Sequence, residues 1–255
     1  MDLAPRTWRE SMLPAEHGVW GYITAAALVG LPLGSHPAGI GIVVFMIAAV
    51  VGRQAIQARR RKNLGGRRPL IVLLCAGMVV VSSLGMTWYL AGYPDWSLWC
   101  MGGLILGGGQ YLWEWWRPTP RPWLRSALGG IAVACMTGAI ARAGGAVNHW
   151  CLVSAVVVGS NLIAMVPLVR SQSRGGTAWT RLAIILQVLI LALGIAGWLL
   201  DFIPVAVTLV CLLGFLRCLW ITRRGAQLSS QAIGLHELAW LPVIAIGVVF
   251  GLRFG

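Results

Sequence analysis

The sequence contains few charged residues. Asp, Glu, Lys and Arg make up 11% of its 255 residues, while hydrophobic residues make up 58%. A soluble globular domain has roughly 25% charged and about 45 to 50% apolar residues. Acidic residues are scarcest, with 7 Asp and Glu against 20 Lys and Arg, a formal net charge of +13. This composition excludes an ordinary soluble domain and indicates a chain whose solvent is lipid.

Several motifs that carry catalysis are also missing from the sequence. We find no G-x-S-x-G, no P-loop, no H-E-x-x-H and no paired aspartates at helical spacing. The cysteines form no C-x-x-C or Cys/His metal spacing. All six lie in apolar stretches, where we interpret them as small packing residues: Cys75, Cys100, Cys135, Cys151, Cys211 and Cys218. No nucleophile is identified, and enzymatic activity stays open.

Long apolar stretches fill most of the chain. A helix needs about 20 apolar residues to cross roughly 30 Å of hydrocarbon. Nine stretches meet this need, at approximately 16 to 33, 37 to 57, 70 to 92, 96 to 115, 125 to 145, 148 to 169, 180 to 199, 202 to 222 and 235 to 253. We therefore predict an all-α integral membrane protein in which residues 1–255 form a single polytopic domain, with no soluble domain. The first stretch lacks a clear signal-peptide cleavage site, so we expect a retained helix.

The basic residues fall in alternate connections. They precede the odd-numbered stretches at Arg6 and Arg9, at 59–68, at Arg117, Arg121 and Arg125, at Arg170, Arg174 and Arg181, and at Arg223 and Arg224. Near the other connections and the C-terminus lie only Arg142 and Arg253. Because basic loops stay in the cytoplasm, we predict a cytoplasmic N-terminus and an outside C-terminus. Loops of roughly ten residues cannot build a nucleic-acid surface, so we expect membrane lipids as partners and no nucleic acid.

Ionisable residues in or beside the apolar stretches need an explanation, because a charge is costly inside a bilayer. They are Glu16, His17, Arg53, Glu114, Arg217, His236 and Glu237, all at predicted cytoplasmic helix ends. Each can sit at its own interface, or they can meet in a cytoplasm-facing cavity; the sequence favours neither. Neighbours such as Glu16 and His17, or His236 and Glu237, point about 100° apart on a helix, so we expect no metal site and no cofactor.

Small residues at four-residue spacing occur in the fourth and fifth stretches, at Gly103 and Gly107, and at Gly130, Ala134 and Gly138. Such spacing allows close helix packing in lipid. We therefore predict that both stretches are interior helices.

The entry to the first stretch, Leu13-Pro14-Ala15-Glu16-His17-Gly18-Val19-Trp20, resembles the P-x-E-H-G-x-W signature of the YwiC-like family of bacterial membrane proteins. The likeness continues into the Arg-rich 59–68 region. The general sequence pattern is similar over most of the chain. It implies a multi-pass protein of the bacterial inner (plasma) membrane.

The chain also resembles, more distantly, the UbiA-type prenyltransferase fold. The likeness lies in the helix count, the charged connections after the second and sixth stretches, and Arg67-Arg68-Pro69-Leu70. The aspartate-rich motifs that hold magnesium in those enzymes correspond to residues 51–59 and 161–174 of this sequence, which contain no acid. If the chain is an enzyme, the resemblance implies a UbiA-like transferase without its usual metal site.

Arginines occupy these positions instead, and a guanidinium repels magnesium but binds phosphate directly. We therefore predict a cytoplasm-facing cavity that binds an anionic amphiphile, such as a lipid or isoprenoid phosphate, through Arg53, Arg59, Arg68, Arg170 and Arg174. Two alternatives stay open. The chain could transport a small solute, or serve as a non-catalytic accessory subunit of a membrane complex with a membrane-protein partner.

Overall fold

The computed structural model describes residues 17–60, 67–92, 94–116, 122–174, 176–224 and 230–255; at some helix ends it describes the backbone alone. These residues form nine α-helices and no strand. The helices are α2 (His17–Leu33), α3 (Ala38–Arg60), α4 (Arg67–Leu90), α5 (Trp96–Trp116), α6 (Pro122–Ala143), α7 (Asn148–Arg174), α8 (Thr177–Leu199), α9 (Val205–Arg224) and α10 (Ser230–Phe254). Each of the nine predicted stretches coincides with one of them.

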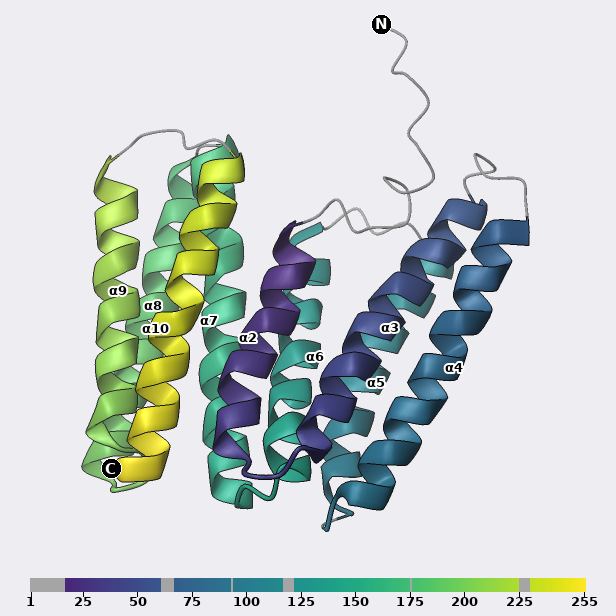
Figure 1. Cartoon of the computed structure of the whole chain (residues 1–255). Helices are drawn as coiled ribbons and strands as arrows, with labels where there is room; N and C mark the ends of the chain where they lie inside the picture. Colours follow the sequence, from purple (N-terminus) through teal and green to yellow (C-terminus); the bar gives the residue numbers. More distant parts are fainter. Residues whose placement is uncertain (1–16, 61–66, 93, 117–121, 175, 225–229) are drawn as a thin grey trace, which may run out of the picture.

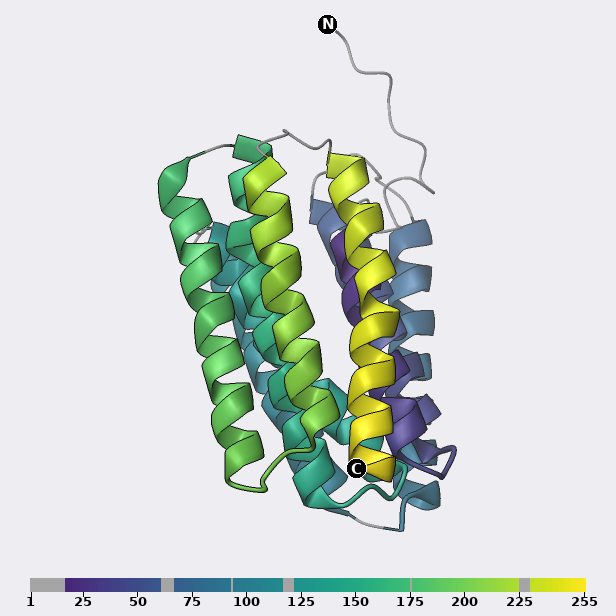
Figure 2. The ribbon, with the colours of Figure 1, turned by 90° about the vertical axis from the view of Figure 1, so that its left-hand side faces the viewer.

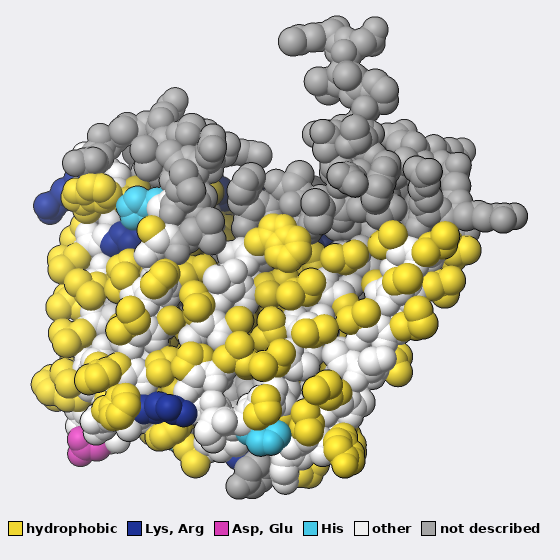
Figure 3. All heavy atoms as spheres, viewed as in Figure 1, with side chains coloured by type: hydrophobic (Ala, Val, Ile, Leu, Met, Phe, Trp, Pro, Cys, Tyr) yellow, Lys and Arg dark blue, Asp and Glu magenta, His cyan; other side chains and the backbone are white. Residues whose placement is uncertain are grey.

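The helices carry the composition of a membrane protein. By length and composition, α3, α4, α6, α7, α8 and α9 can each cross a bilayer, and α2 and α10 contain the shorter apolar segments Trp20–Leu33 and Ala239–Phe254. Apolar side chains cover the side of the molecule between its two ends (Figure 3). An all-helical membrane protein is therefore confirmed at this level.

Successive helices run in opposite directions, so α2, α4, α6, α8 and α10 all start at one end of the molecule (Figure 1). We call this end, uppermost in Figure 1, the upper end, and the opposite one the lower end. Helix α6 packs against α2, α3, α5 and α7, and α7 packs in turn against α8, α9 and α10. Helices α8, α9 and α10 face the viewer in Figure 2.

Two apolar clusters hold these helices together. In one, Ile42 and Phe45 of α3 meet Met136 and Ile140 of α6. In the other, side chains of α2, α6, α7, α9 and α10 meet, with Val207 and Val248 fully buried. Of the two helices predicted to be interior, α6 is central, whereas α5 packs mainly on α6 and also touches α4, where Trp96 lies edge-on against Trp88 with ring centroids 6.1 Å apart. The prediction is therefore wrong for α5, which keeps Leu98, Met101 and Ile105 exposed, because a small-residue face accounts for one close neighbour and does not make a helix interior.

At the lower end, two connections approach backbone to backbone. A Cβ added to Gly34, after α2, would lie 2.5 Å from the Cα of Gly144, after α6. The His36 N–H donates to the Gly144 carbonyl at 3.0 Å. Only residues without side chains fit this approach, so the two glycines fix how α2 and α3 meet α6.

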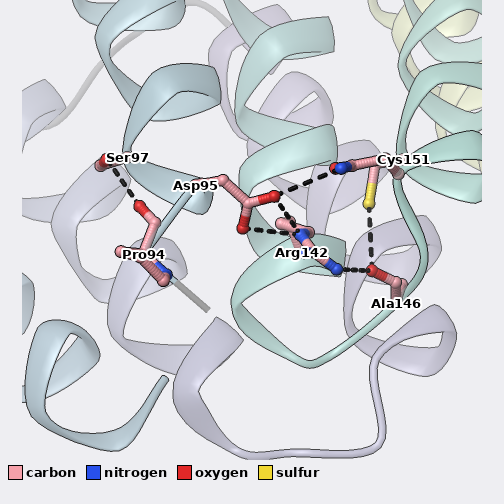
Figure 4. A network of polar contacts seen from close by, with 7 residues as sticks. Pro94, Asp95, Ser97, Arg142, Ala146 and Cys151 are labelled. Atoms are coloured by element: carbon pink, nitrogen blue, oxygen red, sulfur yellow. Dashed lines mark hydrogen bonds and ion pairs between the residues drawn. The ribbon is translucent and has the colours of Figure 1, made fainter. Parts of the chain in front are cut away.

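A polar clamp lies beside this contact (Figure 4). The Nε of Arg142 donates to Asp95 at 2.8 and 2.9 Å, and its Nη1 donates to the Ala146 carbonyl at 2.9 Å. Asn148 Nδ2 donates to the same carboxylate at 3.2 Å. The Arg142 hydrogen bond is the largest cause that holds the pKa of Asp95 below its usual value. The clamp joins the α4–α5 connection to α6 and α7, and it gives Arg142, an exception to the charge pattern, a structural role.

Candidate functional site

Polar side chains are buried among α7, α8, α9 and α10, in helices that are otherwise apolar. Asn161 of α7 is 3% exposed and Gln187 of α8 is 4% exposed, and Thr208 of α9 is also buried. Thr208 Oγ1 donates to the Gly194 carbonyl at 2.9 Å. A buried polar group costs free energy unless it is hydrogen-bonded, so each of these needs a partner. Thr208 has its partner in this carbonyl.

The amides of Asn161 and Gln187 converge on Gly214 of α9. A Cβ added to Gly214 would lie 3.3 Å from Gln187 Oε1, 3.6 Å from Asn161 Oδ1 and 3.7 Å from Trp240 Cζ2 of α10. Asn161 Nδ2 donates to the Val157 carbonyl at 2.9 Å, which fixes the direction of its oxygen. The buried Gln187 Oε1 has no hydrogen-bond partner in the described part of the chain. We call Asn161 and Gln187 the amide pair; it lies near the middle of α7 and α8.

A cation lies one helical turn above the amide pair. Arg217 is three residues beyond Gly214 on α9, about 4.5 Å along the helix axis at 1.5 Å per residue. Its guanidinium carbon lies 5.1 Å from the Trp240 ring centroid, within cation–π range. Its Nε and Nη2 lie 3.3 and 3.2 Å from His236 Nδ1. Two residues of α10 therefore hold the orientation of this guanidinium.

More polar groups follow toward the upper end. The guanidinium carbon of Arg170 on α7 lies 5.0 Å from the Trp179 ring centroid on α8. Ser171 and Gln172, next along α7, are both buried. Polar groups therefore occur from the middle of α7–α10 to their upper end.

The predicted site residues are distributed over two parts of the molecule. Arg217 and His236 lie in direct contact. Arg53 belongs to α3, which packs against α2, α4 and α6, whereas Arg170 belongs to α7, which packs against α2, α6, α8, α9 and α10. Helices α3 and α7 are thus not neighbours in the described packing, and the grouping of Arg53 with Arg170 around one ligand stays a prediction. Glu16 lies outside the described residues, as do the side chains of His17, Arg59, Arg68, Glu114, Arg174 and Glu237.

Sequence reasoning missed Gln187, Gly214 and Trp240. One signal was available for Gln187, which interrupts the apolar run 182–196 as its only polar side chain. Gly214 and Trp240 carry no such signal, because glycine and tryptophan are common throughout this chain and their role depends on which helices become neighbours.

Among the described residues, no group of three or more His, Cys, Asp and Glu side chains lies close enough to hold a metal ion. Comparisons with protein-family models, curated proteins and solved structures gave no match. The buried polar groups of α7–α10 are therefore the basis for a functional proposal.

Proposed function

We propose that this protein crosses the bacterial inner membrane nine times, with the upper end in the cytoplasm, and binds an anionic amphiphile among α7–α10 at that end. The alternating helix directions and the placement of the basic connections support this orientation. The resemblance to YwiC-like proteins supports the bacterial membrane, and the resemblance to UbiA-type enzymes supports a ligand that is an amphiphile.

The geometry of Arg217 carries the proposal. A long arginine side chain usually extends from a membrane helix to the interface. Arg217 instead lies against Trp240 and His236 of the neighbouring helix. A guanidinium held in this way loses little conformational freedom when it binds a phosphate or carboxylate in bidentate fashion. Its position within the helix bundle suits a ligand whose tail lies in the membrane.

The distribution of charge agrees with an anionic ligand. Described arginines at the upper end of α7–α10 are Arg170, Arg181, Arg217 and Arg223. The two carboxylates whose side chains are described, Asp95 and Asp201, both lie at the lower end, in the connections before α5 and α9. Across the whole sequence 20 Lys and Arg outnumber 7 Asp and Glu, so an anion entering from the cytoplasmic leaflet meets a positive potential even with Glu16, Glu114 and Glu237 predicted near that end.

Lipid binding to the purified full-length protein tests the proposal. Dioleoylphosphatidylmethanol and dioleoylphosphatidylcholine share their tails, both lack headgroup hydroxyls and differ in net charge, and native mass spectrometry counts the bound molecules of each. We expect the wild type to bind the anionic lipid at least fivefold more tightly, and Arg217→Ala to lose most of this preference, since a charge-assisted hydrogen bond contributes about 1.5 to 3 kcal/mol.

Arg223→Ala is the matched control, because Arg223 is exposed on the same helix. It removes the same charge but should change the preference less than twofold. Equal binding of the two lipids by the wild type, or an unchanged preference in Arg217→Ala, would reject the proposal. Thermal unfolding of each variant separates lost binding from lost folding.

A further inference from the structure

The amide pair is a site that the anionic-ligand proposal does not use. Asn161 and Gln187 come from different helices and are almost fully buried, yet their oxygens both face Gly214. Two carbonyl oxygens that face one point repel each other unless a hydrogen-bond donor lies between them. Gln187 Oε1 has no donor within the described residues.

A ligand can supply this donor. We infer that the amide pair binds a hydroxyl group of the amphiphile, about one helical turn deeper in the bundle than Arg217, which holds the anionic group. This inference rests on the proposed function and deepens it, because it specifies the ligand class: an anionic amphiphile with a hydroxyl close to its phosphate or carboxylate. The ligand's polar end then reaches from Arg217 to the middle of α7–α10.

Gly214 is essential to this arrangement. A Cβ at Gly214 would lie within 4 Å of both amide oxygens and of the Trp240 ring, so any side chain would crowd the point that a ligand hydroxyl must reach. Glycine lowers helix stability relative to alanine.

Two anionic probes of equal charge test the inference. Dioleoylphosphatidylglycerol carries two hydroxyls in its headgroup, whereas dioleoylphosphatidylmethanol carries none. We expect the wild type to bind phosphatidylglycerol about fivefold to tenfold more tightly than phosphatidylmethanol. This ratio corresponds to the net free-energy contribution of one or two hydrogen bonds. Gln187→Leu should bind the two lipids alike, at about the wild-type affinity for phosphatidylmethanol.

Gly214→Ala provides a second variant that keeps all polar groups. The added methyl would lie 3.3 Å from Gln187 Oε1 and 3.6 Å from Asn161 Oδ1. It should abolish the hydroxyl preference while the protein stays folded, because alanine favours the helix. Gln54→Leu, which removes an amide from α3, is the control and should keep the preference.

Each outcome has a distinct meaning. Equal binding of the two anionic lipids by the wild type overturns the inference and leaves the proposed function standing. A preference that persists in Gln187→Leu and Gly214→Ala also overturns it, because hydroxyl recognition then does not use the amide pair. Binding of both anionic lipids no tighter than phosphatidylcholine means that the proposed function itself has failed.

Discussion

Arg142 and Asp95 lie 47 positions apart in the sequence and form an ion pair with a 2.8 Å separation between Nε and Oδ1. The pair joins the start of α5 to the end of α6 on the side of the molecule opposite the basic connections. It shows that a charged pair can serve the packing of helices in a chain of this apolar composition.

Replacement of Asp95 by Asn should destabilise the lower end. The neutral amide is nearly isosteric but cannot pair with the guanidinium of Arg142, whose side chain is only 12% exposed. Because the Asp95 side chain is 32% exposed, solvent screens part of the interaction, and we expect a loss of about 1 kcal/mol. Denaturant unfolding in mixed detergent micelles measures this loss of stability. Asp201→Asn, at an exposed position at the same end, should change stability by less than half as much.

The same ion pair predicts a pH dependence. The pKa of Asp95 is lower in the folded protein than in the unfolded chain, where an aspartate titrates near 3.9. The stabilisation from the charged carboxylate is therefore fully present above about pH 4 and is lost as the pH falls through the lower folded value. The wild type should be more stable than Asp95→Asn at pH 7, and the difference should shrink below pH 4. A constant difference across this range would contradict a charge-based clamp.

The close approach of Gly34 and Gly144 at the lower end leaves no room for a side chain. Gly34→Ala would place a methyl 2.5 Å from the Gly144 backbone, which cannot move aside as a flexible side chain can. Overpacking of this kind costs about 1 to 3 kcal/mol. Gly77→Ala on α4 is the control, because a Cβ there meets nothing within 4 Å. We expect Gly34→Ala to unfold at a lower denaturant concentration than the wild type. The unfolding midpoint of Gly77→Ala should equal or exceed that of the wild type.

Helix positions could be predicted from this sequence, whereas helix neighbours could not. A span must be long and apolar, so the nine stretches mark the nine helices to within a few residues. Residues that face lipid and residues that face protein are both apolar, so the pattern does not say which helices meet. Gly103 does approach Ala132 of α6, as its spacing predicts, but nothing in the sequence shows that the other faces of α5 stay exposed, as they do at Leu98 and Ile105.

The candidate site shows the same limit. Arg217 and His236 could be named from the sequence, since a charge or an imidazole in an apolar stretch is conspicuous. Their contact with each other depends on α9 packing against α10. The grouping of Arg53 with Arg170 rests on loop positions in a resembling fold, and it stays a prediction, since α3 and α7 are not packed neighbours in this bundle.

The predicted orientation can be measured with single cysteines. In a chain whose six native cysteines are replaced by alanine, Thr177→Cys at the start of α8 and Asp201→Cys after its end mark the two ends of one helix, and both positions are exposed. A membrane-impermeant maleimide added to intact cells should label the second and not the first, because the upper end is predicted to be cytoplasmic. Permeabilised cells should show labelling of both. The reverse pattern in intact cells would place the basic connections outside and, with them, remove the support for an anionic ligand that enters from the cytoplasmic leaflet.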